Sequence, residues 1–550
     1  MWRVLAFLAL SAGAFGQPFV YYRGVVNAGS FLPPGLPNGA IARGSMFSVF
    51  GRNLGPASAQ QVSAFPLQPT FAGVAVELSQ GTNKVSALPV YVSAAQLNVI
   101  LPSTTPLGAV SLRVVYNGQT GNPIPINVTA ASIGLFSVNG GGFGPGIVQN
   151  FVSQASQPIN SLSATARPGQ TEILWGTGLG AATFSDAVAP TAVTLDTSLE
   201  LFVGGVKAAV SYAGRTPCCA SIDQIVFAVP ANAPSGCYVP VVARSCNGLV
   251  SNTVTMAIDS SGAPCRDAHN PLSSQFRGGG KTAITHLARE TIRVDVRANP
   301  PYDVVSDTLL ATFRDEAASD FFFSAFTALP PLGSCTNYGG STTRVFSLGS
   351  PFARPGGQID VGAALTVESP ARRVEAQAIG GGLEGTFAEL LGGVSPVRAI
   401  PVSVLSAGPF TIAALGKGSI APFRFVLEPV NTLSWTNRDQ IVTVGRARDL
   451  TVTWSGTPGV SRGVAILGFA ERTSYNAVGG FICLAQPNTT GFTIPSYVLS
   501  ALPASDLAES SNSARISVGN IPLGTTASLA GFDYAVLGVS AWSGKTVIIQ

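Results

Sequence analysis

Ser461 is a candidate catalytic nucleophile, because residues 459–463 match the pattern G-x-S-x-G. In hydrolases this pattern places a nucleophilic serine on a sharp turn between a strand and a helix, and an aspartate and a histidine follow later in the chain. The two histidines of the sequence, His269 and His286, both lie upstream, and residues 464–467 read as a strand. We therefore interpret residues 459–463 as a turn between two strands.

Three acidic residues lie close together and could form the carboxylate pair of a glycoside hydrolase: Asp315, Glu316 and Asp320. The two carboxyl groups of such a pair must face each other across a cleft. Neighbours in a turn are poor candidates for this geometry, so solvated side chains are the favoured interpretation. The adjoining phenylalanines, at 321–323 and 326, are predicted to belong to the core.

Asp295, Asp303 and Asp307 could supply oxygen ligands to a calcium ion between strands. Acidic residues at strand ends are more often solvated, and His269 also fits a solvated position. Two histidines cannot form a zinc site without cysteine or carboxylate ligands, and the sequence has no H-E-x-x-H pattern. No catalytic residue and no metal site is predicted.

The glycine-rich stretch 278–282 ends like a phosphate-binding loop, with Lys281 followed by Thr282. The pattern G-x-x-x-x-G-K-[ST] requires a glycine at the position of Gln275, so we interpret the stretch as a flexible joint and predict no cofactor. The net charge is only +4, and the chain has no run of Lys or Arg. A nucleic-acid partner is therefore not expected.

The composition favours many short strands over long helices. Charged residues make up 11% of the 550 residues, where a soluble domain has roughly a quarter. Hydrophobic residues make up 46%, and there are 62 glycines and 39 prolines. Abundant glycine, proline and β-branched residues fit strands joined by tight turns. The length is sufficient for three or four domains.

Two copies of one motif organise the N-terminal half. Residues 44–55 and 169–180 each read as a short apolar strand, a glycine, a polar pair and Leu-Gly, and the segments 96–102 and 223–230 each read as a strand ending at proline. Both comparisons give an offset of about 125 residues, which indicates a tandem duplication. Strand residues should alternate inward, and the first glycine should permit a bend that a Cβ would block. The motif glycines are Gly51, Gly55, Gly176 and Gly180.

Together with the Asn-Ala-Gly-Ser-Phe run at 27–31, these motifs resemble those of IPT/TIG immunoglobulin-like domains, in a bacterial secreted subtype. The resemblance covers residues 20–260. It implies tandem immunoglobulin-like β-sandwiches, but it implies no ligand residue. Members of this family bind proteins, sugars or DNA, and a shared fold does not carry function with it.

Regularly spaced strand and turn signals continue to the C-terminus, so the predicted fold class is all-β, with tandem immunoglobulin-like β-sandwiches followed by a further β-sandwich-type region. The last region is either one domain or two sandwiches that meet near residue 430. The predicted domains are a signal peptide (1–16), a first (17–130) and a second (131–260) immunoglobulin-like domain, a linker (261–280) and a C-terminal region (281–550).

The expected strand directions predict one disulfide near the end of the duplication. Cys237 begins the strand 238–243, and Cys246 follows its far end, so these two are roughly 30 Å apart and cannot bond. The next strand, 250–258, returns antiparallel and brings Cys265 back towards Cys237. We therefore predict a bond between Cys237 and Cys265.

The same directions place Cys218 and Cys219 at the Cys246 end. One of this adjacent pair, Cys219 in the simplest assignment, is predicted to bond Cys246, which leaves the other free. Cys335 and Cys483 would then pair and tie the two halves of the C-terminal region together. The alternative is that the last two are separate buried thiols.

The absence of a coherent catalytic set favours a non-catalytic binding or adhesion protein, secreted or at the cell surface. Its partner would be an extracellular protein or a glycan that the sequence does not identify. Two alternatives stay open: a secreted carbohydrate-active hydrolase with a carboxylate site in the C-terminal region, and a structural spacer. No transmembrane segment is expected in the mature chain, because no later apolar run approaches ~18–20 residues.

Export gives the first testable prediction. Arg3 precedes an apolar run, 4–12, and small residues at 14 and 16 complete a signal-peptide pattern with cleavage before Gln17. The run is shorter than the ~20 residues that span a bilayer. N-terminal sequencing of protein from the native host should therefore begin at Gln17, and a mature chain that still starts at Met1 would contradict export.

Overall fold

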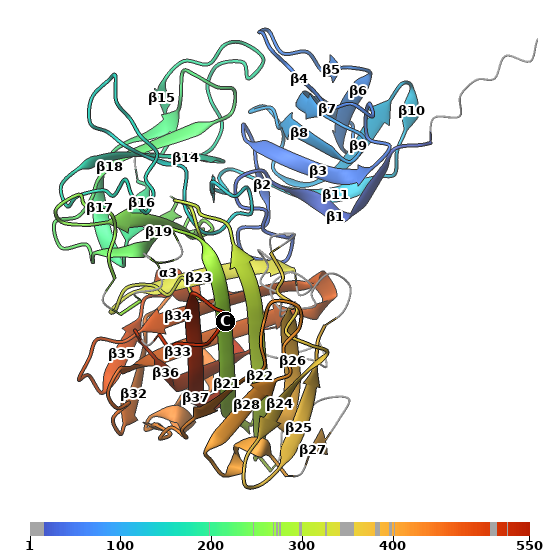
Figure 1. Cartoon of the computed structure of the whole chain (residues 1–550). Helices are drawn as coiled ribbons and strands as arrows, with labels where there is room; N and C mark the ends of the chain where they lie inside the picture. Colours follow the sequence, from blue (N-terminus) through green and yellow to red (C-terminus); the bar gives the residue numbers. More distant parts are fainter. Residues whose placement is uncertain are drawn as a thin grey trace, which may run out of the picture.

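The computed structural model describes residues 16–550 except 197, 246, 268, 271–272, 274, 276, 296–299, 325–326, 342–356, 380–384, 395–398, 401, 506–513 and 525. The expected signal peptide lies almost entirely outside these residues. The chain is all-β and forms three units, two smaller ones side by side above a larger third one (Figure 1). We call them the first unit (19–129), the second unit (134–258) and the third unit (280–549).

The first unit is an immunoglobulin-like β-sandwich. Its strands pair in the order β1-β3-β8-β7-β6-β9-β11-β2. The long strand β7 belongs to both layers, because residues 83–87 pair with β6 and residues 88–92 pair with β8. The strands are β1 (Phe19–Asn27), β2 (Ile41–Ala42), β3 (Met46–Arg52), β4 (Gln60–Gln61), β5 (Thr70–Phe71), β6 (Val74–Gln80), β7 (Asn83–Val92), β8 (Gln96–Ile100), β9 (Gly108–Tyr116), β10 (Gln119–Thr120) and β11 (Ile124–Thr129).

The second unit repeats this arrangement, in the order β12-β14-β18-β17-β16-β19-β20. Its long strand β17 also changes layers, since residues 206–208 pair with β16 and residues 209–215 pair with β18. The strands are β12 (Gly134–Leu135), β13 (Val148–Asn150), β14 (Thr171–Thr177), β15 (Val193–Thr194), β16 (Glu200–Val203), β17 (Val206–Arg215), β18 (Asp223–Ala228), β19 (Gly236–Arg244) and β20 (Val254–Ile258).

The two units match residue by residue at the motifs found in the sequence. Phe50 of β3 lies opposite Gln96 of β8, and Trp175 of β14 lies opposite Gln224 of β18. Two of the motif glycines are explained by the close approach of a neighbouring strand: a Cβ on Gly51 would collide with a backbone carbonyl of β1, and a Cβ on Gly176 with a backbone carbonyl of β12. Only glycine leaves room for these contacts.

The third unit contains long strands and very little helix. Its elements are β21 (Gly280–Val294), β22 (Tyr302–Glu316), β23 (Cys335–Ser341), β24 (Ala364–Glu368), β25 (Arg373–Gln377), β26 (Thr386–Val394), β27 (Ala399–Ile400), η1 (Val404–Ser406), β28 (Phe410–Ala414), β29 (Phe423–Leu427), β30 (Ser434–Trp435), η2 (Arg438–Gln440), β31 (Thr443–Val444), β32 (Leu450–Ser455), β33 (Arg462–Arg472), η3 (Thr473–Tyr475), β34 (Ala477–Leu484), β35 (Gly491–Ile494), α3 (Ser496–Leu499), β36 (Arg515–Pro522), β37 (Tyr534–Thr546) and β38 (Ile548–Ile549).

One nine-stranded sheet, in the order β23-β34-β33-β36-β37-β21-β22-β26-β27, draws strands from both sides of residue 430. The two halves therefore share this sheet, and each half adds a smaller sheet, β25-β24-β28-β29 before residue 430 and β30-β32-β35 after it. Two hydrophobic cores lie against it, one beside β24, β28 and β29 and the other beside β30, β32 and β35. The segment 261–280, expected as a linker, is packed: Cys265, Asn270 and Ser273 are buried.

Two disulfides have the expected partners. Cys237 bonds Cys265, as the strand directions predicted, and Cys335 bonds Cys483, the pair that remained after the other assignments. The second pair joins directly opposed residues of β23 and β34, so it links strands that are far apart in the sequence. All four cysteines of these two bonds are buried.

The third expected disulfide is wrong. Cys218 and Cys219 bond each other, so neither is available to Cys246, which lies outside the described residues. The prediction used only the direction of the strands. It overlooked that β17 ends at Arg215 and β18 begins opposite it at Asp223, which places both cysteines within one short loop.

One inward position differs in polarity between the two units. Phe47 of β3 is fully buried in the first core, and Glu172 takes the equivalent place on β14, also fully buried. Among the described residues, no hydrogen-bond partner reaches either carboxyl oxygen of Glu172. Burial without a cation raises the pKa of Glu172 to about 9, so the side chain is neutral at physiological pH.

This difference predicts a pH-dependent stability. Since the folded chain keeps the Glu172 proton up to a pKa of about 9 while the unfolded chain loses it near 4.5, the free energy of unfolding falls as pH rises through that window. The slope from this group is at most roughly 1.4 kcal/mol per pH unit. Glu172→Gln should remove that slope. Urea titrations at pH 5 to 9 measure it, with hydrogen exchange of β14 as the local readout.

The matched control is Glu77→Gln, which changes an exposed carboxyl on β6 and should leave the pH dependence unaltered. Equal slopes in Glu172→Gln and the unmodified chain would show that the carboxyl of Glu172 is solvated or paired.

Candidate functional site

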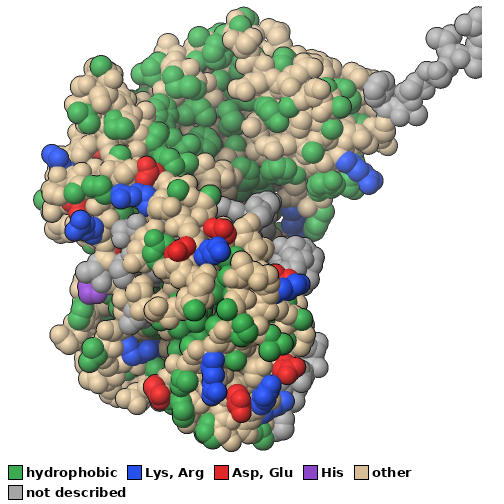
Figure 2. Space-filling model, in the orientation of Figure 1, with side chains coloured by type: hydrophobic (Ala, Val, Ile, Leu, Met, Phe, Trp, Pro, Cys, Tyr) green, Lys and Arg blue, Asp and Glu red, His purple; other side chains and the backbone are tan. Residues whose placement is uncertain are grey.

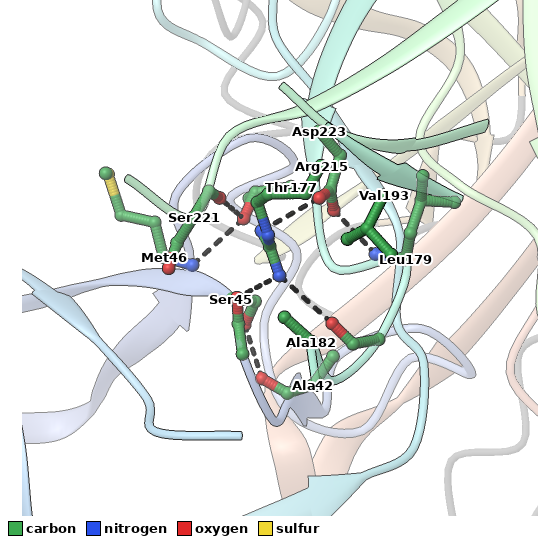
Figure 3. Close-up of polar contacts among 12 residues, drawn as sticks. Ala42, Ser45, Met46, Thr177, Leu179, Ala182, Val193, Arg215, Ser221 and Asp223 are labelled. Atoms are coloured by element: carbon green, nitrogen blue, oxygen red, sulfur yellow. Dashed lines mark hydrogen bonds and ion pairs between the residues drawn. The ribbon is translucent and has the colours of Figure 1, made fainter. Parts of the chain in front are cut away.

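A buried ion pair lies where the first and second units meet (Figure 3). Arg215, at the end of β17, and Asp223, at the start of β18, lie 2.8 Å apart, and both side chains are 1% exposed. Buried charges are tolerated only when they are paired and hydrogen-bonded. Burial raises the pKa of Asp223 to about 6, against the opposing effects of the Arg215 guanidinium and of two backbone N–H groups.

Arg215 also joins the two motif copies. Its Nη2 donates to the carbonyl oxygen of Gly44 at 2.8 Å and to that of Gly180 at 3.1 Å. Gly44 opens the first motif and Gly180 ends the second, so one guanidinium bridges both units. Gly44 has a φ of 76°, and a Cβ there would lie 2.8 Å from the Gly180 carbonyl oxygen, which explains the glycine.

A second chain of hydrogen bonds runs beside the ion pair. The backbone N–H of Met46 donates to Thr177 Oγ1 at 2.9 Å, and Thr177 Oγ1 donates to the Ser221 carbonyl oxygen at 2.7 Å (Figure 3). We call Arg215, Asp223 and Thr177, with their partners, the unit latch. It is fully enclosed and offers no access to a substrate, so its role is to hold the first two units in one orientation.

The residues considered for catalysis do not form a site. Ser461 lies in an exposed turn with a φ of 55°, and strand β33 follows it, without the helix of a nucleophile elbow. His269 is exposed. His286 Nε2 lies 2.8 Å from Ser540 Oγ, which also accepts a hydrogen bond from Trp542. Burial lowers the pKa of His286 to about 4, and Ser540 is fully buried, so this pair is not accessible to a substrate.

The acidic candidates are separately engaged. Asp315 and Glu316 are consecutive residues of β22 and point to opposite sides of the sheet. Glu316 pairs with Arg314 at 2.9 Å, and Asp320 accepts a hydrogen bond from Ser163 of the second unit. These carboxylates do not face one another across a cleft.

The three aspartates weighed as calcium ligands each have their own cation. Asp295 pairs with a lysine at 3.0 Å, and Asp303 and Asp307 pair with arginines at 3.5 and 3.2 Å. Within the described ranges, no group of three or more metal-ligating side chains comes together. The phenylalanines Phe322 and Phe323 are buried beside the second unit, as expected for core residues; Phe326 lies outside the described residues.

A cavity of about 530 Å³ lies between the first and third units. In Figure 1 this is where the lower edge of the first unit, with β1, β2 and β11, approaches the third. The third unit contributes three polar side chains, Arg446, Arg472 and Tyr475. None of the described lining residues is acidic. The full lining is Val25, Pro34, Gly35, Leu36, Pro37, Gly39, Ala40, Ile41, Ala109, Pro125, Ile126, Asn127, Arg446, Arg472, Tyr475, Pro503 and Ala504.

Both arginines of this cavity keep donors without an acceptor in the described structure. Arg446 donates through Nη1 to the Leu502 carbonyl oxygen at 3.2 Å, but its buried Nε has no partner. Arg472 stacks its guanidinium 4.6 Å from the centre of the Tyr475 ring, and its buried Nε is also unpartnered. Burial lowers the pKa of Arg446. A buried donor without a partner calls for a specific explanation, such as a functional role or a bound water or ion.

A cation–π ladder borders the cavity. Arg23 lies 4.4 Å from the Tyr22 ring centre and 5.2 Å from that of Tyr475, and it donates to the Ser474 carbonyl oxygen. Arg23 has a φ of 60°, an unusual conformation for a residue with a Cβ. Tyr475 is 38% exposed and Tyr22 is 77% exposed. We call Tyr22, Arg23, Tyr475, Arg472 and Arg446 the junction site.

All three units converge beside this site. Leu32 and Leu36 of the first unit, Phe143 of the second, and Tyr338 and Ala477 of the third pack in one hydrophobic cluster. The junction site therefore depends on the placement of all three units. Sequence reasoning missed it because its residues come from both ends of the chain, although the Arg-Thr-Ser-Tyr run at 472–475 was a local signal of an arginine beside an aromatic ring.

No protein-family model and no curated protein matches the sequence. Among solved structures, SGBP-B from a complex xyloglucan utilization locus of Bacteroides uniformis is 10% identical, with 75% of this chain and 97% of that one covered and a TM-score of 0.17. Domains 4–9 of the surface layer protein SbsC are 9% identical, covering 96% and 66%, with a TM-score of 0.16.

Immunoglobulin domains 1–4 of Sidekick-1 are 10% identical, covering 97% and 99%, with a TM-score of 0.12. At such identities and TM-scores these likenesses assign no function to the chain. In the described part of the chain, no helix is both long and apolar enough to cross a membrane.

The unit latch yields a stability prediction. Arg215→Met leaves the Asp223 carboxylate buried without its cation, and removing one partner of a buried pair costs ~3–5 kcal/mol. The loss should appear in urea unfolding, together with faster hydrogen exchange where β3 meets β14. The double variant Arg215→Met with Asp223→Leu should recover part of it, because no isolated charge remains buried although the Gly44 and Gly180 carbonyl oxygens and the Leu179 N–H lose their partners.

The control for this prediction is Lys207→Met. Lys207 pairs with Glu200 at the surface, where the lysine side chain is 62% exposed, so its loss should change stability by less than about 1 kcal/mol. Equal effects of Arg215→Met and Lys207→Met would contradict a structural role for the latch.

Proposed function

We propose that the chain is an exported, non-catalytic binding protein whose ligand occupies the junction site. One observation carries the proposal: a cavity of about 530 Å³ between two units is lined by Arg446 and Arg472, whose buried Nε donors have no partner in the described structure. Ligand sites prefer boundaries between domains, measure roughly 300–1,000 Å³, and combine apolar walls with a few convergent polar groups.

Export to the cell surface or the medium is part of this proposal. The signal-peptide pattern of residues 1–16 supports it, and so do three disulfides among the described residues, because disulfides persist in oxidising compartments. We further propose that residues 17–130 and 131–260 are domains of the IPT/TIG-like type, that 261–280 connects them to the third unit, and that 281–550 forms the C-terminal region. The shared strand order of the first two units supports the duplication.

The rival functions fit the geometry less well. A hydrolase in the third unit would need two free carboxyl groups facing each other, whereas Glu316 is ion-paired and Asp315 points to the opposite side of β22. A structural spacer has no use for unpartnered arginines inside a cavity, since leaving a buried donor unsatisfied costs ~1–3 kcal/mol.

The proposal predicts binding without turnover. The mature chain should bind a component of a combined glycan and protein array and should leave a glycosidase, esterase and peptidase panel unprocessed. Tyr475→Ala should weaken the binding about tenfold, which is the effect of removing roughly 1.4 kcal/mol. The control is Tyr302→Ala, which removes an exposed tyrosine of β22 outside the cavity and should bind normally.

Two results would contradict the proposal. Turnover of any panel substrate that disappears in Asp315→Asn or Glu316→Gln would establish the hydrolase. Binding that is equally strong in Tyr475→Ala and the unmodified chain would place the ligand elsewhere.

A further inference from the structure

We infer that the junction site takes an acidic oligosaccharide, whose carboxylate or sulfate group accepts hydrogen bonds from Arg446 and Arg472. This inference rests on the proposed binding function and deepens it by naming the ligand class. The shared chemistry of the two anionic groups is an oxyanion that matches the planar fork of donors on a guanidinium.

The charge of the ligand follows from the lining. Two arginines face the cavity, and none of its described lining residues carries a carboxylate. Arg472 stacks on the Tyr475 ring, which fixes its guanidinium plane without using the hydrogen-bonding capacity of Nε. A second cation, Arg23, lies 5.2 Å from the centre of the same ring. Two guanidinium groups in the lining, with a third beside Tyr475, favour an anion over a neutral or cationic ligand.

The saccharide part follows from the walls. The Tyr475 ring and the proline rings of the lining offer flat apolar surfaces of the size of a pyranose ring, whose axial C–H bonds form an apolar face. Asn127, on β11, is exposed at the cavity, and its amide can bond ring hydroxyls. The exposed Tyr22 ring of the junction site, which is linked to Tyr475 through Arg23, offers a further aromatic surface for a longer saccharide. The proline rings belong to Pro34, Pro37, Pro125 and Pro503.

A peptide is disfavoured as the ligand by the edge of β1. Extended peptides usually bind by adding a strand to a free sheet edge. The pairing of β1 with β3 is irregular between Val20 and Val25, and the positive φ of Arg23 bends the strand at that point. The Asn122 side chain already bonds both the N–H and the carbonyl of Val20. An irregular, occupied edge cannot template a regular strand.

Titration calorimetry with the full mature chain tests the inference. The probes are a tetrasaccharide of galacturonate, a sulfated tetrasaccharide, a neutral tetrasaccharide of galactose and an acidic tetrapeptide. Arg446→Gln and Arg472→Gln should each weaken the acidic saccharide roughly 10- to 100-fold, as expected for losing a hydrogen bond to a charged group. The control, Arg448→Gln, removes a nearby exposed arginine outside the lining and should bind like the unmodified chain.

The probes separate the possible outcomes. Preference for the galacturonate or the sulfated probe identifies which anion the arginines bind. The variant Arg472→Lys keeps the positive charge but lacks the planar fork of donors, so it should bind the acidic saccharide with intermediate affinity. Equal affinity for the neutral probe, or a normal affinity in both glutamine variants that fold as judged by circular dichroism, would overturn the inference. Binding of the tetrapeptide alone would also overturn it.

The failure of the inference can be distinguished from the failure of the proposed function. If no tetrasaccharide binds but Tyr475→Ala abolishes binding to another array component, the ligand class is wrong and the junction site remains the binding site. If Tyr475→Ala changes nothing on the array, the site itself is wrong.

Discussion

The Arg215 guanidinium holds the first two units together, and the placement of the rest of the chain depends on that contact. It bonds Asp223 and the Gly180 carbonyl oxygen within the second unit, and the Gly44 carbonyl oxygen across the boundary. These partners offset the free-energy cost of desolvating the guanidinium. A neutral side chain of the same size would leave the Asp223 carboxylate and the two carbonyl oxygens without this donor. The second unit is in turn anchored to the third, where Phe202 stacks on Tyr497 at 4.4 Å and Tyr238 donates to the Phe322 carbonyl oxygen. Fixed in this way, the first unit meets the third at the junction site.

Charged residues are scarce on this protein, which makes the unpartnered arginines informative. Charged residues amount to 11% of the chain, and the face in Figure 2 shows few of them among apolar and neutral polar side chains. Several charged side chains of the third unit form ion pairs between neighbouring strands, such as Arg289 with Asp307. Arg446 and Arg472 differ, since they bring buried donors to a cavity and leave them unmatched in the described structure. Glu172 is unpartnered too, but it lies within a closed core and carries a proton.

Local patterns in the sequence predicted much of the fold. The spacing of the motif glycines located equivalent strands in both units, so Phe50 and Trp175 have equivalent partners in Gln96 and Gln224. Strand direction was enough to pair Cys237 with Cys265, because the two strands form one hairpin. The same reasoning failed for Cys219, since a bond between adjacent residues depends on the conformation of a loop and not on strand direction. Nor could the sequence show that one sheet crosses residue 430, because β21 pairs with β37 more than 240 positions away.

The junction site could not be predicted from the sequence for a related reason. Arg23 and Tyr475 belong to different units and meet only when three units are placed together, and nothing in their local sequence fixes that arrangement. The most direct test is a crystal structure of the mature chain with bound galacturonate tetrasaccharide. The account predicts an oxyanion within hydrogen-bond distance of the guanidinium groups of both Arg446 and Arg472, with a sugar ring against Tyr475. A saccharide bound elsewhere, or a cavity closed by the protein's own side chains, would contradict it.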